Sequence, residues 1–145
     1  AEPKQITLRR TGAAPLTFVG GELAHAMSYT SGGAPFWYEV NVFRMQGAGF
    51  VGDVRMFAKR DGETDRFTVM VAESFDEVIS FLENYDAAAD VAIDLDLDDQ
   101  ELSLAELTAK ALGVRIKAEQ ARRQYRNLVG QMLFDLDQAS AQGHA

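Results

Sequence analysis

The sequence predicts an α+β fold: an antiparallel β-meander of four to five strands in the N-terminal half, then a short helix and a long C-terminal helix. Residues 36–73 contain three strand-like runs. The two short turns that join them both contain glycine, a pattern typical of antiparallel neighbours. A helix-start signal at Ser74 precedes apolar residues spaced by three and four. A second start signal at Ser103 opens a longer stretch with the same helical spacing.

The length of 145 residues predicts one domain over residues 1–139, with the β-meander in 1–74, the helical half in 75–139 and a flexible tail in 140–145. The composition is that of an ordinary globular protein, with 47% apolar and 25% charged residues. The chain contains no cysteine, which excludes disulfides and thiolate sites and fits a cytoplasmic location. We expect no membrane association, because no apolar run approaches the roughly 18–20 residues that span a bilayer. The chain begins at Ala1, so the sequence leaves open whether a leader was removed.

Residues 1–35 predict two strands. Residues 5–10 alternate in polarity and predict the first, and a turn follows at 12–15. Residues 16–29 predict the second, with a bulge or bend at Gly20 and Gly21. A helical turn over 22–27 is the alternative, because glutamate, leucine and alanine favour helix. Residues 30–35 form a loop.

Three further strands are predicted at residues 36–46, 50–60 and 66–73. Alternation places one strongly apolar set of side chains on one face of the sheet and a mixed set on the other. The apolar set is Phe36, Tyr38, Val40, Val42, Phe50, Val54, Met56, Phe67, Val69 and Val71. The mixed face carries charged residues together with Trp37, Phe43, Phe57 and Met70. We interpret Trp37, Phe43 and Phe57 as lining either a ligand pocket or an interface, unless the long helix covers them.

A short helix is predicted to begin after Ser74 and to end near Asn84. Ser74 and Glu77 have the spacing of a capping box, and Asp76 also suits the positive end of the helix dipole. Its apolar face should cover the apolar side of the meander; the residues are Val78, Phe81, Leu82 and Tyr85.

Residues 73–106 contain twelve acids and no base, and residues 86–101 form an acidic connector that could add an edge strand. Asp94, Asp96 and Asp98 resemble the first half of a calcium loop. The sixth position lacks the glycine of such loops, and Ala105 stands at the twelfth in place of glutamate. We therefore expect a solvated acidic connector, with no metal and no cofactor.

The long helix carries an apolar stripe at helical spacing, with Leu136 as its extension. The stripe residues are Val114, Ala118, Ala121, Tyr125, Leu128 and Met132. Such a stripe is either core packing or a dimer seam, and the sequence leaves both open. The same stretch carries a run of basic side chains with Glu119 as the only acid among them: Lys110, Arg115, Lys117, Arg122, Arg123 and Arg126.

The basic run has two interpretations on a chain whose net charge is −8. The favoured one is charge pairing with the acidic segment, within a chain or across a dimer. The other is DNA binding, because residues 104–114 resemble the first helix and turn of a helix-turn-helix, with Ala109 and Gly113 at the motif's small positions. That resemblance implies phosphate or base contacts from Arg115, Lys117, Arg122 and Arg123. Glu119 and Arg122 stand where the motif has buried aliphatic residues, and the net charge disfavours nucleic acid.

No residue pattern predicts catalysis. His25 and His144 lack a neighbouring nucleophile or a metal-ligand spacing, and the glycine pairs lack the strand-to-helix context of a phosphate loop. We therefore predict a non-enzymatic module that forms a homodimer or docks to a protein partner through the long helix and the mixed sheet face. The predicted interface residues are Val114, Ala118, Ala121, Arg122, Tyr125, Arg126, Leu128 and Met132. The alternatives are a small DNA-binding regulator using residues 103–126 and a small-molecule binder or enzyme with a pocket near Trp37.

Overall fold

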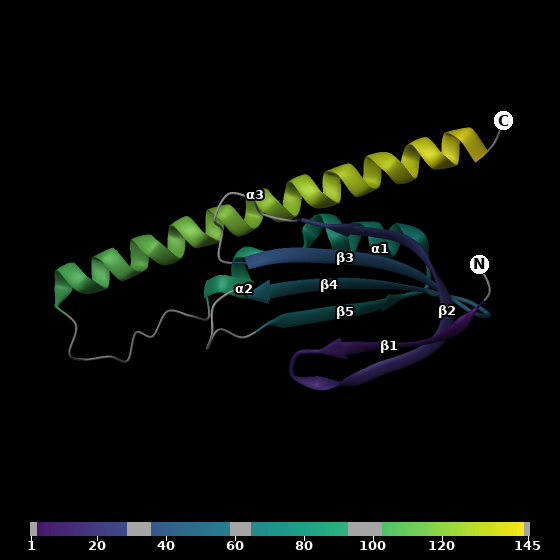
Figure 1. Cartoon of the computed structure of the whole chain (residues 1–145), viewed down its shortest axis with the longest axis horizontal. Coiled ribbons are helices and arrows are strands. Elements are labelled where there is room, and N and C mark those ends of the chain that lie inside the picture. Colours follow the sequence, from purple (N-terminus) through teal and green to yellow (C-terminus); the bar gives the residue numbers. More distant parts are fainter. Residues whose placement is uncertain (1–2, 29–35, 59–64, 93–102, 144–145) are drawn as a thin grey trace.

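A computed structural model of the chain describes residues 3–28, 36–58, 65–92 and 103–143 (Figure 1). Five strands form one antiparallel sheet in the order β1-β2-β3-β4-β5, which confirms the predicted α+β meander. The strands are β1 (Lys4–Arg10), β2 (Ala13–Met27), β3 (Phe36–Met45), β4 (Phe50–Ala58) and β5 (Arg66–Ala72). Three helices follow: α1 (Phe75–Asn84), α2 (Ala88–Ala92) and α3 (Leu104–Gly143).

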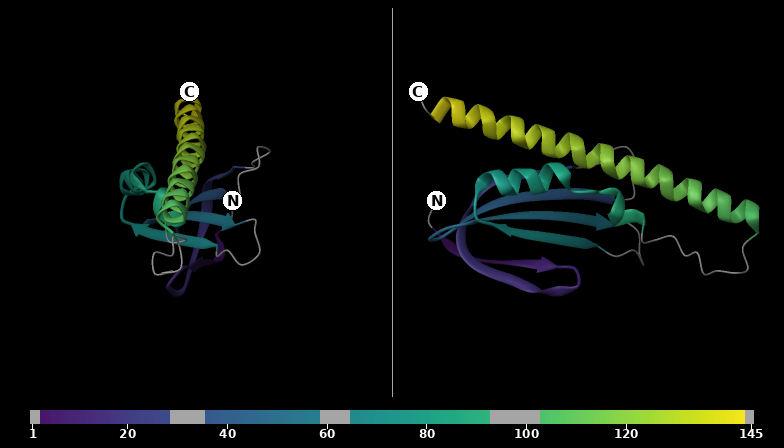
Figure 2. Two further views of the ribbon diagram at one scale, coloured as in Figure 1. Left: turned by 90° about the vertical axis from the view of Figure 1, so that its left-hand side faces the viewer. Right: turned by 180° about the vertical axis from the view of Figure 1, so that it is seen from behind.

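The sheet curls into a half-barrel, so that β1 comes close to β5 at one end (Figure 2). The backbone N–H of Thr11 donates to the carbonyl of Phe67 over 2.9 Å, and the N–H of Phe67 donates to the Thr11 hydroxyl over 2.7 Å. The concave side encloses a small core of its own, made of Ile6, Leu8, Phe18, Phe43 and Val51. Phe43, one of the predicted pocket residues, is therefore core packing.

Strand β2 runs without interruption through the two glycines, so the alternative of a helical turn over residues 22–27 is wrong. A Cβ on Gly20 would lie 2.1 Å from the carbonyl oxygen of Arg44, so only glycine allows the two strands to approach this closely. The irregularity in pairing falls just beyond the glycines, between Glu22 and Ala24. Leu23 is the extra residue of this bulge, and its side chain remains largely exposed.

The pairing of β4 with β5 corrects one part of the predicted face assignment. Arg55 pairs with Phe67 and Asp53 with Val69, so these β5 residues share the concave face. Met70 instead packs toward the helices, opposite Gly52. The prediction sorted β5 by hydrophobicity, which fails here because both faces of the sheet are covered.

Helix α1 covers the other, convex face of the sheet, as predicted (Figure 1). The N–H of Glu77 donates to the Ser74 hydroxyl over 3.2 Å, which confirms the predicted cap, and the Glu77 carboxylate accepts from the N–H of Glu73. Val78 and Phe81 lie directly against Gly52 of β4. The absence of a side chain at Gly52 is thus what lets α1 pack close to the sheet.

Helix α3 is a single helix of 40 residues that crosses the same face beside α1 (Figures 1 and 2). The predicted start is confirmed, because Ser103 accepts a hydrogen bond from the N–H of Glu106 over 3.2 Å. The interruption expected at Gly113 is absent, and residues 140–143, which the sequence assigned to the tail, are helical. The predicted edge strand at residues 91–98 is wrong for residues 91 and 92, which belong to helix α2. Its remainder, with the calcium-like loop at residues 94–101, lies outside the described residues.

We expect Gly20→Ala to lower the free energy of unfolding by roughly 2–3 kcal/mol, because the added methyl group meets backbone that cannot move aside. Gly21→Ala is the matched control, since open space surrounds its Cβ position and the change should stay within about 0.5 kcal/mol. Urea denaturation of both variants measures the difference. Equal midpoints would contradict the assigned register of β2 and β3.

Candidate functional site

The N-terminal part of α3 extends beyond the sheet and past α2 (Figure 1). We call residues 104–116 the projecting segment. None of its side chains is buried, and three of its large apolar residues are more than half exposed: Leu104 at 82%, Leu112 at 54% and Ile116 at 52%. Apolar side chains of this size on a helix surface mark a place where another surface can bind.

One face of the projecting segment continues the apolar stripe of the rest of the helix. Leu104, Leu107, Ala111 and Val114 are spaced by three and four, and the next member of the series is Ala118. The spacing therefore runs without interruption from Leu104 to Met132, which is the heptad pattern of helix–helix packing. The sequence analysis began this stripe at Val114, and extending the count backwards would have found the first ten residues.

The remainder of the stripe packs on the molecule's own sheet and α1. Ala121, Tyr125 and Met132, all predicted interface residues, are buried in the main core, and Val129 is buried with them. This core lies against the apolar face of the sheet, whereas the core-packing alternative of the sequence analysis had placed the stripe against the mixed face.

The other predicted interface residues lie nearer the surface. Ala118 and Leu128 are partly buried and pack against the main core. Val114 is partly buried at the edge of the projecting segment, while Arg122 and Arg126 are exposed.

Polar contacts fix α3 to the sheet at one level of the helix. The Ser28 hydroxyl donates to the side-chain oxygen of Gln124 over 2.6 Å, and the amide of Gln124 donates to the carbonyl of Phe36 over 3.4 Å. The Tyr125 hydroxyl donates to the carbonyl of Leu82 at the end of α1 over 2.5 Å. These bonds set how far α3 can slide along the sheet, and therefore how much of it projects.

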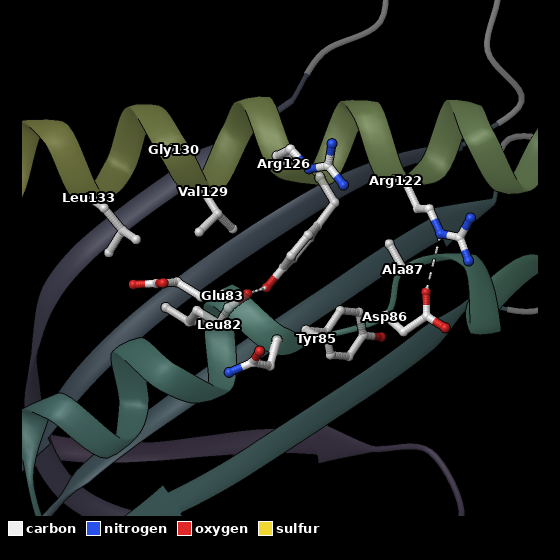
Figure 3. Close-up of a pocket in the computed structure, with 12 residues that line it drawn as sticks. Leu82, Glu83, Tyr85, Asp86, Ala87, Arg122, Arg126, Val129, Gly130 and Leu133 are labelled. Atoms are coloured by element: carbon white, nitrogen blue, oxygen red, sulfur yellow. Dashed lines mark hydrogen bonds and ion pairs between the residues drawn. The ribbon is translucent and has the colours of Figure 1, made fainter.

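A groove of about 450 Å³ lies between the end of α1 and α3 (Figure 3). Arg122 lies 3.6 Å from the carboxylate of Asp86 and 3.1 Å from that of Glu119. The first of these pairs joins the acidic segment to the basic helix within one chain, as the favoured interpretation of the basic run expected. Exposed pairs of this kind contribute about 0–1 kcal/mol each, so their role is mainly to set geometry.

A buried carboxylate anchors α2 to the sheet. Asp90 accepts hydrogen bonds from Tyr38 over 2.8 Å and from Tyr85 over 2.7 Å. Burial raises the pKa of Asp90 above its ordinary value, although the two phenols and Arg66 oppose this effect. Burial and the nearby carboxylate also raise the pKa of both tyrosines, so neither phenol ionises at neutral pH. The cluster therefore acts as a fixed hydrogen-bonded anchor.

The concave face carries a second polar chain, which crosses β2, β3 and β4. Nδ1 of His25 lies 2.6 Å from the side-chain oxygen of Asn41, whose amide nitrogen donates to Asp53 over 3.1 Å. Nε of Arg55 lies 3.0 Å from the same carboxylate, at an angle that makes it an ion pair without a hydrogen bond. Burial raises the pKa of Asp53, and the charge of Arg55 opposes this. Asp53 is fully buried, so its carboxylate is not accessible to a substrate.

The aromatic residues predicted to line a pocket stack against one another on this concave face. The rings of Trp37 and Phe57 are 5.1 Å apart and nearly parallel, and Phe57 meets Phe67 edge-on at 5.9 Å. Trp37 and Phe57 are half-buried. The long helix lies on the opposite face of the sheet and does not cover them (Figure 2).

Within the described ranges, no three histidine, aspartate or glutamate side chains are grouped so as to hold a metal ion. In the same part of the chain, no helix is both long and apolar enough to cross a membrane. The helix-turn-helix interpretation is wrong for this structure, because α3 continues through Gly113 where the motif requires a turn.

The fold thus defines an α+β protein with a curled five-strand meander and one projecting helix. Comparisons with known protein families, with curated proteins and with solved structures found no match.

Asp53→Asn tests the buried carboxylate through its pH dependence. The pKa of Asp53 is raised in the folded state, so the group favours folding at acid pH and loses this contribution as the pH rises through the folded-state value. We expect the asparagine variant to gain stability relative to the wild-type protein as the pH rises above the ordinary aspartate pKa of about 4. Urea midpoints at several pH values measure this, with exposed Asp135→Asn as control. A parallel shift of the two variants with pH would contradict the assignment.

Proposed function

We propose that the protein is a non-enzymatic interaction module that self-associates through the projecting segment of α3. One observation carries the proposal. The heptad stripe is buried by the molecule's own sheet and α1 from Ala121 onward, while none of its side chains from Leu104 to Val114 is buried and Leu104 is 82% exposed. A second helical or grooved surface is what such a stripe packs against.

The energetics of the segment support this. A solvent-exposed helix of about thirteen residues is only marginally stable alone, and its stability in a protein comes chiefly from packing its apolar face. Burying an exposed leucine contributes about 1.5–3 kcal/mol. A partner that covers Leu104 and Leu107 would therefore add an appreciable share of an association free energy.

The mixed face of the sheet, which the sequence analysis joined to the long helix as a docking surface, is not part of the proposal. That face lies inside the half-barrel, where Phe43 and Val51 form the small core. The proposed docking surface therefore consists of the projecting segment of α3 and the surface that receives it.

We expect the wild-type protein to show a mass of about twice 15.9 kDa in light scattering coupled to gel filtration, falling toward 15.9 kDa on dilution. Leu104→Gln with Leu107→Gln should give 15.9 kDa throughout, because both substitutions remove apolar contact from the stripe. Far-UV circular dichroism checks that the helix persists in the variant.

Ala109→Gln is the matched control for the stripe, because it places the same side chain on the face of Leu112 and Ile116, which the stripe does not include. It should dimerise as the wild-type protein does, and loss of the dimer in this variant would assign the contact to that second face instead. A wild-type mass of 15.9 kDa at every concentration would overturn self-association.

A further inference from the structure

We infer that the projecting segment binds an apolar groove at the opposite end of α3 in a second copy of this chain. The inference rests on the proposed self-association and names its receptor. The groove lies between α1, the C-terminal part of α3 and the bulge of β2.

The groove has a volume of about 610 Å³ and a predominantly apolar lining. Its apolar residues are Leu23, Phe75, Ile79, Leu133 and Leu136. Leu23 reaches it because the bulge in β2 adds one residue there, and the side chain stays 42% exposed. A groove of this composition suits the apolar face of a helix.

The charges of the two surfaces are complementary. Lys110 and Arg115 flank the apolar stripe of the projecting segment. Glu83 and Asp137 stand at the groove. Helix α1 contains no base, and α3 contains none after Arg126. A basic amphipathic helix and an acidic apolar groove attract each other. Pairing of segment with segment, or of groove with groove, would bring like charges together.

A single chain cannot satisfy this pairing by itself. The segment and the groove lie toward opposite ends of one continuous helix (Figure 1). An uninterrupted helix does not fold back on itself, because its backbone hydrogen bonds hold it straight. The groove must therefore be supplied by another molecule.

Direct pairing of two projecting segments is disfavoured by charge. The heptad positions that flank the stripe inside the segment include Lys110 and Arg115. In a parallel coiled coil the g position of one helix faces the e position of the other, and since Lys110 and Arg115 occupy these positions, like charges would meet along the seam. Segment-into-groove packing places the same cations beside carboxylates.

Each copy carries one segment and one groove, so two copies can bind each other reciprocally. Such an exchange closes on itself with two-fold symmetry and forms the contact twice. The segment is about 20 Å long at 1.5 Å per residue. The dimer would then be held by two apolar contacts with acidic and basic flanks.

Charge reversal tests the inference. Lys110→Glu with Arg115→Glu should raise the dissociation constant at least tenfold in sedimentation equilibrium, and Glu83→Lys with Asp137→Lys should do the same. The chain with all four substitutions should dimerise again, because the charges are complementary once more. The control is Lys4→Glu with Arg44→Glu, which also reverses two positive charges but does so on the sheet. It should leave the dissociation constant unchanged.

Cysteine cross-linking is a second readout, since the natural chain has no cysteine. A mixture of the Ala111→Cys and Ile79→Cys chains should form a disulfide-linked pair, and neither chain alone should do so. Cross-linking by Ala111→Cys alone would overturn the inference in favour of segment pairing.

The failures of the two proposals are distinguishable. If the wild-type protein dimerises and the glutamine variants of Leu104 and Leu107 do not, but the groove variants dimerise normally, the groove is not the receptor and self-association stands. If the wild-type protein is monomeric at all concentrations, self-association itself is wrong.

Discussion

The architecture depends on the continuity of α3. A helix of 40 residues is about 60 Å long, whereas the ten residues of β3 span about 33 Å. The sheet can therefore cover only part of the helix, and the remainder must lie outside. The anchors at Gln124 and Tyr125 place the covered part toward the C-terminal half. The exposure of Leu104, at 82%, and the lack of buried side chains in the projecting segment follow from this rigid geometry.

The two cores explain why the sheet itself offers little free surface. Strands β3 and β4 are buried on both faces, by the helices on one side and by the curled β1–β2 hairpin on the other. Polar side chains within these layers are bonded across strands, as Asn41 is to Asp53, or to the short helix, as Tyr38 is to Asp90. Such networks fix register and rigidity in the body. Four of the large apolar side chains that remain exposed outside these layers lie on α3: Leu104, Leu112, Ile116 and Phe134.

Local signals in the sequence were sufficient for most of the fold. Turn glycines delimited β3, β4 and β5, and serine caps at Ser74 and Ser103 located both main helices. These local signals did not determine the features that depend on three-dimensional packing. The face of β5 depends on a register that puts Phe67 opposite Arg55. The continuity of α3 through Gly113 costs only about 1 kcal/mol of helix propensity, which neighbouring residues offset. Nothing local indicated that burial of the stripe begins only near Ala121.

The basic residues of α3 lie toward its N-terminus and its C-terminal part carries acids without bases. The helix dipole favours acids near the N-terminus and bases near the C-terminus, but its influence fades within one turn of each end. Lys110 and Arg115 near the start, and Asp135 and Asp137 near the finish, lie beyond that reach and run in the opposite sense. Local helix energetics therefore do not account for the arrangement. A basic end and an acidic end on one rigid helix are the charge pattern on which the proposed segment-to-groove contact relies.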